Sequence, residues 1–116
     1  MLQHSLINTS KNKLQSSELL TLNETTASSK LSLAYDSLRE LLEAIALKNG
    51  YKIYNHECYT AFLKEILNES AKGDLFDQIR KARNSVNYYG KEISLEECQK
   101  LINQIKELRA NLEKYC

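Results

Sequence analysis

A chain of 116 residues, 42% of them hydrophobic, is long enough for one hydrophobic core and too short for two ordinary domains. Its 16 lysines and arginines nearly balance 15 acidic residues, so the net charge of +1 excludes a broad electrostatic attraction to nucleic acid or to an anionic membrane. Proline is absent and glycine occurs three times, which favours helices over the whole length. We therefore expect a single all-α domain over residues 1–116, in which any anion site is local.

The sequence predicts a cytoplasmic protein without membrane contact. Its first residues lack the basic and apolar regions of a secretory signal, and no apolar run approaches the roughly 20 residues that span a bilayer. The three cysteines form no C-x-x-C pair and are odd in number, which favours free thiols over a zinc site or a disulfide framework: Cys58, Cys98 and Cys116. No His or Cys residues form a pair at ligand spacing, so we expect neither a metal nor another cofactor.

Two helices are expected in the first half of the chain. The first covers about residues 2–20, where apolar residues are separated by polar ones that favour caps and turns as much as helix: Leu6, Ile7, Leu14 and Leu20. The second is the clearest, because apolar residues recur every three or four positions from Ala27 to Ile45. Gly50 then follows at the place where a left-handed residue commonly ends a helix.

Two further helices are expected in the middle of the chain. Asn55 is a candidate N-cap for a helix that ends near Gly73 and has one apolar side: Tyr59, Phe62, Leu63, Ile66 and Leu67. Asp74 then caps the next helix, and Asp77 in its first turn suits the positive end of the helix dipole. The apolar side of this fourth helix consists of Leu75, Ile79, Ala82 and Val86.

The last helix begins at a capping box. Ser94 and Glu97 match the S-x-x-E pattern, in which the serine and glutamate side chains satisfy backbone N–H groups at a helix start. The apolar side of the helix follows: Cys98, Leu101, Ile105, Leu108 and Leu112. Short connections and one apolar stripe per helix predict an up-and-down bundle of about five helices, most of them antiparallel to their neighbours.

A polar stripe borders the apolar side of the expected fourth helix. Offsets of three, four, seven and eight residues place five side chains on a common side of this helix: Arg80, Arg83, Asn84, Asn87 and Tyr88. Guanidinium groups match phosphate oxygens, and asparagine amides can read a base edge or a sugar hydroxyl. The ring of Tyr88 or of the next residue, Tyr89, can stack on a base. The stripe therefore indicates a nucleotide- or phosphate-binding site.

Spacing alone leaves a structural alternative open. Arg80 and Arg83 can pair with Asp77 or with acidic residues on a neighbouring helix, and both tyrosines can pack at the rim of the core. In that case the stripe stabilises the fold and binds nothing.

A family resemblance lies in the same segment. The residues RNSVNYYG at positions 83–90 resemble the helix-borne R-x(4-6)-H motif of the HEPN family, the nucleotide-binding domains of higher eukaryotes and prokaryotes. Asn84 fits the polar residue that commonly follows the motif arginine. Upstream, residues 34–44, then Gly50-Tyr51-Lys52 and His56, are similar to the family's second helix and the loop after it. The resemblance covers residues 27–90 and implies a helical bundle with its site at Arg83.

The motif histidine of this family is missing. It would fall at Tyr88, Tyr89 or Gly90. For nuclease members, the resemblance implies RNA cleavage without a metal, in which the histidine assists the 2′-hydroxyl and the arginine stabilises the phosphate. A tyrosine with its ordinary pKa of about 10 is a poor base at neutral pH. Any catalysis would therefore depend on Arg83 with Tyr88.

Two residues outside the stripe are candidates for a supporting role. His56 could supply the missing base from another helix or across a dimer interface, although a lone histidine beside an N-cap is more often structural. Glu43 could orient Arg83, although an i,i+4 pair with Arg39 is the plainer interpretation.

Three functions follow from these residues. The first is a HEPN-like module that binds a nucleotide, RNA or a partner protein through the polar stripe, as part of a toxin–antitoxin type system. The second is a metal-independent ribonuclease toxin that uses Arg83 with Tyr88 or with His56. The third is a non-catalytic helical partner of a separately encoded minimal nucleotidyltransferase, which the resemblance implies. The resemblance also implies a homodimer, in which two copies of Arg83 form a joint anion cleft. The missing histidine favours the first function.

Overall fold

The structure is a computed structural model that describes residues 2–88 and 93–116, except for the side chains of residues 87 and 88. The described residues form five α-helices: α1 (Leu2–Leu19), α2 (Ala27–Lys48), α3 (Cys58–Ala61), α4 (Ser70–Tyr88) and α5 (Leu95–Leu112). A π-helical turn (Phe62–Ile66) extends α3, and a 3₁₀ turn (Glu113–Tyr115) follows α5. None of these helices is long and apolar enough to cross a membrane. The predicted all-α fold is confirmed.

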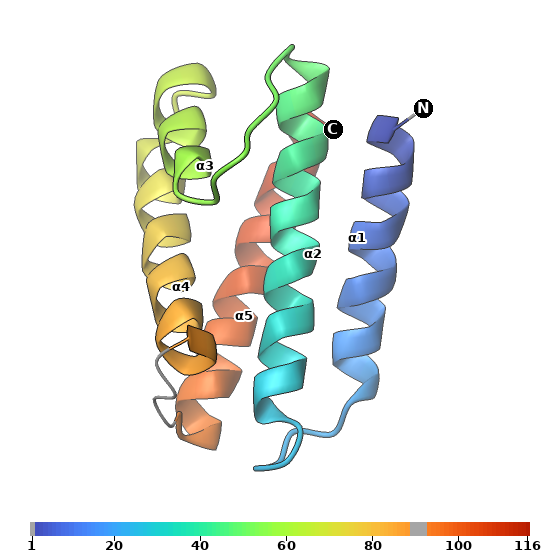
Figure 1. Ribbon diagram of the computed structural model, residues 1–116, viewed down its shortest axis with the longest axis vertical. Coiled ribbons are helices and arrows are strands. Elements are labelled where there is room, and N and C mark those ends of the chain that lie inside the picture. Colours follow the sequence, from blue (N-terminus) through green and yellow to red (C-terminus); the bar gives the residue numbers. More distant parts are fainter. Residues whose placement is uncertain (1, 89–92) are drawn as a thin grey trace.

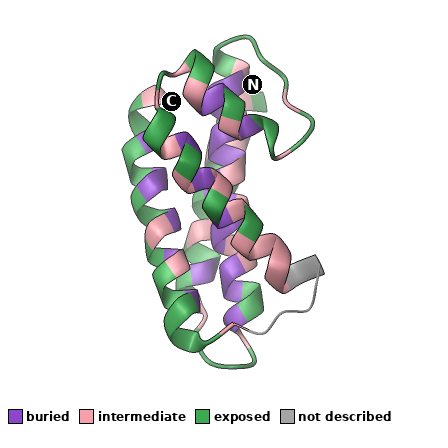
Figure 2. Ribbon diagram, turned by 90° about the vertical axis from the view of Figure 1, so that its left-hand side faces the viewer, coloured by how far each residue is buried: buried purple, intermediate pink, exposed green. Residues whose placement is uncertain are grey.

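The four long helices alternate in direction along the chain (Figure 1). α1 and α2 form an antiparallel pair, α5 packs mainly on α2, and α3 with its π-helical turn lies beside the first half of α4. α2 is the central helix, because 13 of its 22 residues are buried. Figure 2 shows buried residues on the inward sides of the helices and exposed ones outside. The prediction of one apolar stripe over residues 27–45 underestimated how many residues of α2 are buried, because other helices cover α2 on more than one side.

α1 packs on α2 through serines rather than through a hydrophobic stripe. Its buried residues are Ser10 and Ser17, seven positions apart. Ser10 Oγ donates to the backbone oxygen of Ser37 (2.5 Å), and Ser37 Oγ donates back to the oxygen of Ser10 (2.6 Å). Ser17 Oγ donates to the oxygen of Lys30 (2.8 Å), and Arg109 of α5 donates to Ser10 Oγ (3.1 Å). The polar composition of residues 2–20 therefore serves a close, hydrogen-bonded helix contact.

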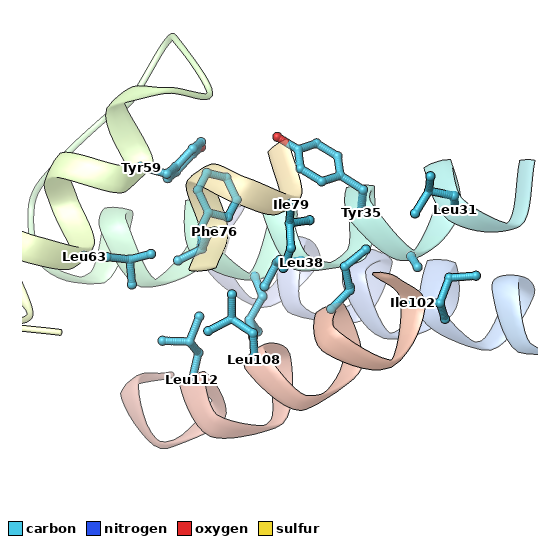
Figure 3. Packing of buried hydrophobic residues seen from close by; sticks show 14 of the residues in the cluster. Leu31, Tyr35, Leu38, Tyr59, Leu63, Phe76, Ile79, Ile102, Leu108 and Leu112 are labelled. Atoms are coloured by element: carbon cyan, nitrogen blue, oxygen red, sulfur yellow. The ribbon is translucent and has the colours of Figure 1, made fainter. Parts of the chain in front are cut away.

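The hydrophobic core lies between α2, α4 and α5 (Figure 3). Five of its members, drawn from all three helices, are at most 1% exposed: Tyr35, Leu38, Phe76, Ile79 and Leu108. Tyr59 of α3 and Leu63 of the π-helical turn also belong to this core. Burying each such side chain stabilises the fold by about 1.5–3 kcal/mol. The Phe76 ring centroid lies 6.1 Å from that of Tyr35, so α4 is held against α2 one turn before the polar stripe begins.

Two predicted helix ends are confirmed. α2 ends at Lys48, and Gly50 has a φ of 84°, in the left-handed region that glycine adopts without strain. α5 begins after Ser94, whose Oγ accepts a hydrogen bond from the backbone N–H of Glu97 (3.0 Å).

The predicted helix boundary near Gly73 is wrong. The π-helical turn ends at Ile66, and Asn68 takes the left-handed conformation with a φ of 55°. α4 then begins at Ser70, so Gly73 and Asp74 lie inside this helix rather than between two helices. The chain turns at Asn68, an amide residue that tolerates positive φ better than most.

Neither predicted cap at this part of the chain has that role. α3 begins at Cys58 after Glu57, which makes no side-chain cap hydrogen bond, and Asn55 lies in the preceding turn. Asp74 is in the second turn of α4, and Asp77 lies beyond its first turn. Asp74 instead pairs with Lys64 across the helix contact, with Oδ1 and Nζ 2.5 Å apart.

Gly73 is buried where α4 passes the helical segment before it. A Cβ atom at this position would lie 2.7 Å from Cγ of Lys64 and 3.1 Å from the backbone oxygen of Thr60. Both distances are shorter than ordinary van der Waals contact, and the backbone oxygen belongs to α3. The glycine therefore permits close packing between helices. From the sequence alone, a glycine that permits close helix packing cannot be distinguished from a glycine that ends a helix.

Gly73→Ala tests this interpretation. We expect the free energy of unfolding to fall by about 1–3 kcal/mol, the usual cost of overpacking, although alanine in an open helix position would raise it by about 1 kcal/mol. Urea unfolding measures the difference. The control Gln78→Ala, at an exposed position of the same helix, should change it by less than about 0.5 kcal/mol. A more stable Gly73→Ala variant would show that no close contact exists there.

Candidate functional site

One pocket lies between the loop after α2 and the second half of α4. Loop residues 54–57 form one wall and α4 forms the other, around an open space of about 390 Å³. Figure 1 shows the loop (green) running between α2 and α4 before the chain enters α3. We call this space the arginine pocket, and it is lined by Tyr54, Asn55, His56, Glu57, Arg80, Arg83 and Asn84.

Tyr35 of α2 connects the two walls. Its ring is fully buried, and Cζ of Arg83 lies 4.8 Å from the ring centroid, which is a cation–π contact. Its Oη lies 3.2 Å from Nδ1 of His56, a hydrogen bond in which either group can be the donor. Burial raises the pKa of Tyr35 to about 12, against the opposing effect of Arg83, so the hydroxyl stays protonated. One buried ring thus positions a guanidinium and an imidazole.

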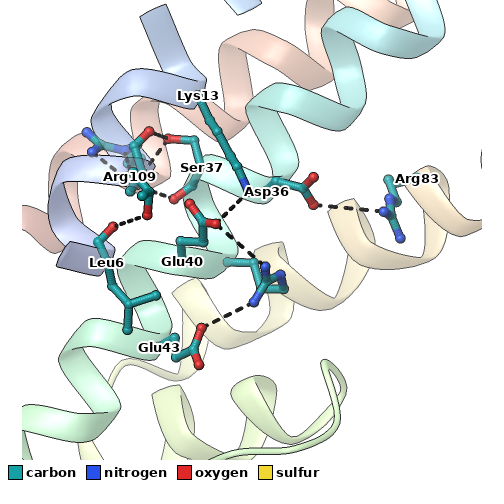
Figure 4. A network of polar contacts seen from close by, with 11 residues as sticks. Leu6, Lys13, Asp36, Ser37, Glu40, Glu43, Arg83 and Arg109 are labelled. Atoms are coloured by element: carbon teal, nitrogen blue, oxygen red, sulfur yellow. Dashed lines mark hydrogen bonds and ion pairs between the residues drawn. The ribbon is translucent and has the colours of Figure 1, made fainter. Parts of the chain in front are cut away.

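Arg83 is held at the pocket by contacts from two helices. Its side chain is 11% exposed, and its NH2 lies 3.9 Å from Oδ1 of Asp36 on α2. The dashed line between Asp36 and Arg83 in Figure 4 marks this ion pair. Arg83 NH1 also donates to Oδ1 of the adjacent Asn84 (3.4 Å). The guanidinium is therefore oriented by Tyr35, Asp36 and Asn84 together.

Arg80, one turn earlier, is paired with an acid of its own helix. Its NH2 lies 2.8 Å from Oδ1 of Asp77, and Lys81 Nζ lies 3.0 Å from the other carboxylate oxygen. Hydrogen bonds from Arg80 and then Lys81 lower the pKa of Asp77, so this carboxylate is ionised at neutral pH. Pairing of the two arginines with Asp77 and with an acid of a neighbouring helix is what the structural alternative predicted. It leaves both guanidiniums lining the arginine pocket.

The charges continue from the pocket across α2 toward α1. Arg39 NH1 lies 3.4 Å from Oε2 of Glu43, and its NH2 lies 3.9 Å from Oε1 of Glu40. Glu40 in turn pairs with Lys13 of α1 at 2.5 Å. Figure 4 shows these contacts as one network of alternating charges. Glu43, predicted as a support for Arg83, is thus placed against Arg39, and Asp36 is the carboxylate paired with Arg83.

His56 is half-buried in an electropositive environment. Burial lowers its pKa below 6.5, and the cations Arg39 and Arg83 lower it further, outweighing Asp36. The imidazole is therefore neutral at neutral pH and can donate one hydrogen bond and accept another. Because Nδ1 is engaged by Tyr35, Nε2 is the ring nitrogen left for other contacts.

The structure brings together three of the five residues of the predicted stripe. Arg80, Arg83 and Asn84 line one pocket, together with His56 from the loop. The side chains of Asn87 and Tyr88, and the whole of Tyr89, lie outside the described residues. Among the described residues, no three His, Cys, Asp or Glu side chains gather where they could hold a metal ion.

Several residues that line or support the pocket were not assigned from the sequence. Tyr35 and Asp36 lie within the helix that was expected from Ala27 to Ile45, but neither was assigned to the site. Tyr54 and Glu57 belong to a loop without periodicity, and Asn55 was interpreted as a cap. The available signal was the composition of residues 54–57, which places an aromatic ring, an amide, an imidazole and a carboxylate side by side.

Comparisons with known proteins add no relative. The chain matches no protein-family model, no curated protein and no solved structure. The functional argument therefore depends on the residues of the arginine pocket.

The depressed pKa of His56 gives a direct test of this geometry. Because the folded state binds the proton less readily than the unfolded state, His56 contributes stability above pH 6.5 that is lost as the pH falls below it. We expect its NMR titration midpoint to lie below 6.5 and to rise in Arg39→Gln, which removes a neighbouring cation. Lys106→Gln, whose ion pair is with Glu18 of α1, should leave it unchanged. A midpoint at or above 6.5 would contradict the placement of His56.

Proposed function

We propose that the chain is a HEPN-like domain that binds the phosphate of a nucleotide or of RNA in the arginine pocket. One observation carries this proposal. Arg80 and Arg83 of α4 line the same open pocket as His56 of the loop after α2. Guanidinium groups present N–H donors in a planar fork that matches phosphate oxygens. A neutral imidazole adds a further donor without a fixed charge.

The electrostatics of the pocket support an anion of limited size. The net charge of the chain is only +1, so attraction must come from the pocket itself. Each guanidinium near the pocket forms an ion pair with a carboxylate, which holds it in place without a bound ligand. The pairs are Arg39–Glu43, Arg80–Asp77 and Arg83–Asp36. The long 3.9 Å ion pair of Arg83 with Asp36 is the weakest of these contacts by distance. A phosphate that approaches Arg83 competes with Asp36 at this longer distance.

The resemblance to the HEPN family leads us to propose that two copies of the chain associate with their α4 helices near each other. Two arginine pockets would then face a common region and bind a polyanion more strongly than one.

A metal-independent ribonuclease is the second candidate, favoured by the position of His56. His56 lines the same pocket as Arg83, which supports this candidate. If Nδ1–H donates to Tyr35, Nε2 carries the lone pair that takes the proton from an RNA 2′-hydroxyl. The 2′-oxygen then attacks phosphorus, the P–O5′ bond breaks, and the 5′-oxygen takes up a proton. The products are a 2′,3′-cyclic phosphate and a 5′-hydroxyl end, with Arg83 stabilising the negative charge.

One experiment tests both candidates. Wild type, Arg83→Lys, Arg83→Ala and Lys106→Ala are incubated with labelled single-stranded RNA in EDTA and scored for retained RNA and for cleaved RNA. We expect Arg83→Ala to weaken binding about 10- to 100-fold, because a charge-assisted hydrogen bond contributes about 1.5–3 kcal/mol. Arg83→Lys, which keeps the charge but loses the fork, should bind with intermediate affinity. Lys106→Ala, on the α1 side of the bundle, should bind like wild type.

Thermal unfolding of each variant provides the folding control, since Arg83 packs on the buried Tyr35 ring. Binding that depends on Arg83 without cleavage supports the binding domain. Cleavage that is lost in Arg83→Ala and also in His56→Gln supports the ribonuclease. Equal binding by Arg83→Ala and Lys106→Ala would contradict both.

A further inference from the structure

Tyr54 is an exposed aromatic ring at the edge of the arginine pocket. Its side chain is 81% exposed, although it lines the pocket with the cationic residues. Lys52 Nζ lies 5.8 Å from the ring centroid, over one part of the ring. An exposed tyrosine beside a cationic pocket offers a flat apolar surface of the kind on which nucleic-acid bases stack.

The two walls of the pocket differ in chemistry. The α4 wall carries two guanidiniums and an amide: Arg80, Arg83 and Asn84. The loop wall carries the Tyr54 ring, the Asn55 amide, His56 and the carboxylate of Glu57. A phosphate is attracted to the two guanidiniums of the α4 wall and repelled by Glu57, so its preferred place is against α4. Glu57 and Asn55 present the acceptors and donors that amino groups of a base or ribose hydroxyls require.

The size of the pocket exceeds that of a phosphate alone. A volume of about 390 Å³ falls within the range of about 300–1,000 Å³ that small-molecule sites occupy. The space therefore leaves room for an organic group next to the anion, and the loop wall offers that group an aromatic surface.

We infer that the arginine pocket takes a nucleotide with an unpaired base, which stacks on Tyr54 while the phosphate is bound by Arg80 and Arg83. This inference rests on the proposed phosphate-binding function. It assigns the base-stacking role to the loop before α3, whereas the sequence pointed to tyrosines at the end of α4. The ligand is a free nucleotide or the unpaired end of an RNA strand, because both present the same base and phosphate.

Calorimetric titration of wild type, Tyr54→Leu and Tyr54→Phe tests the inference, with AMP and the base-free ribose 5-phosphate as probes. We expect Tyr54→Leu to weaken AMP binding about 5- to 150-fold, the usual effect of removing a stacking ring. Its affinity for ribose 5-phosphate should equal that of wild type. Tyr54→Phe keeps the ring and should bind AMP like wild type. Comparing AMP with a 5′-phosphorylated single-stranded RNA distinguishes the two sources, because the source with the higher affinity is the one that the pocket prefers. The same RNA in a duplex hides its bases and should not gain from Tyr54.

The outcomes separate this inference from the function beneath it. AMP binding that is lost in Arg83→Ala but unchanged in Tyr54→Leu would overturn the stacking role and leave the phosphate site standing. An equal loss of AMP and ribose 5-phosphate in Tyr54→Leu would show that the ring only shapes the loop, which also overturns it. If no probe binds wild type, the proposed phosphate site fails and the inference fails with it.

Discussion

The buried ring of Tyr35 is the contact on which both the core and the site depend. Toward the core it stacks on Phe76, with centroids 6.1 Å apart, and this packing holds α4 against the central helix α2. Toward the pocket it lies 4.8 Å from the Arg83 guanidinium and 3.2 Å from His56 Nδ1. Burial keeps its hydroxyl protonated, so the hydrogen bond to His56 persists over the physiological pH range. Arg83 and His56 are thus positioned by a residue of the core.

The helical pattern of the sequence predicted most of the fold but not the contacts between helices. Periodicity identified α2, α4 and α5. The helix start at Ser94 and the helix end before Gly50 are confirmed, because these residues act through a local hydrogen bond and a backbone preference. The role of Gly73 could not be predicted, since only the three-dimensional contact with Thr60 distinguishes a packing glycine from a helix end. The serines of α1 were likewise interpreted as weak helix formers, whereas Ser10 and Ser37 exchange hydrogen bonds between helices.

The candidate site was predictable where its residues share a helix and unpredictable where they do not. Arg80, Arg83 and Asn84 stand at helical spacing, so their common side follows from the sequence. The approach of His56 and Tyr54 to that side depends on the path of the loop after α2, which no periodicity describes. Asp36 was not assigned for the same reason, because its pairing with Arg83 is a contact between α2 and α4. The roles of the Asn87 and Tyr88 side chains and of Tyr89 remain predictions.

The central claim, that a phosphate-bearing ligand enters between the 54–57 loop and α4, is tested most directly by mapping where a ligand binds. Backbone amide signals of the ¹⁵N-labelled protein are followed by NMR during titration with a short 5′-phosphorylated single-stranded RNA. The account predicts that the largest shift changes occur at residues 54–57 and 80–84, with little change along α1 and α5. Shift changes centred on α1 or α5 would contradict it. The absence of shift changes at the highest RNA concentration reached in the titration would also contradict it.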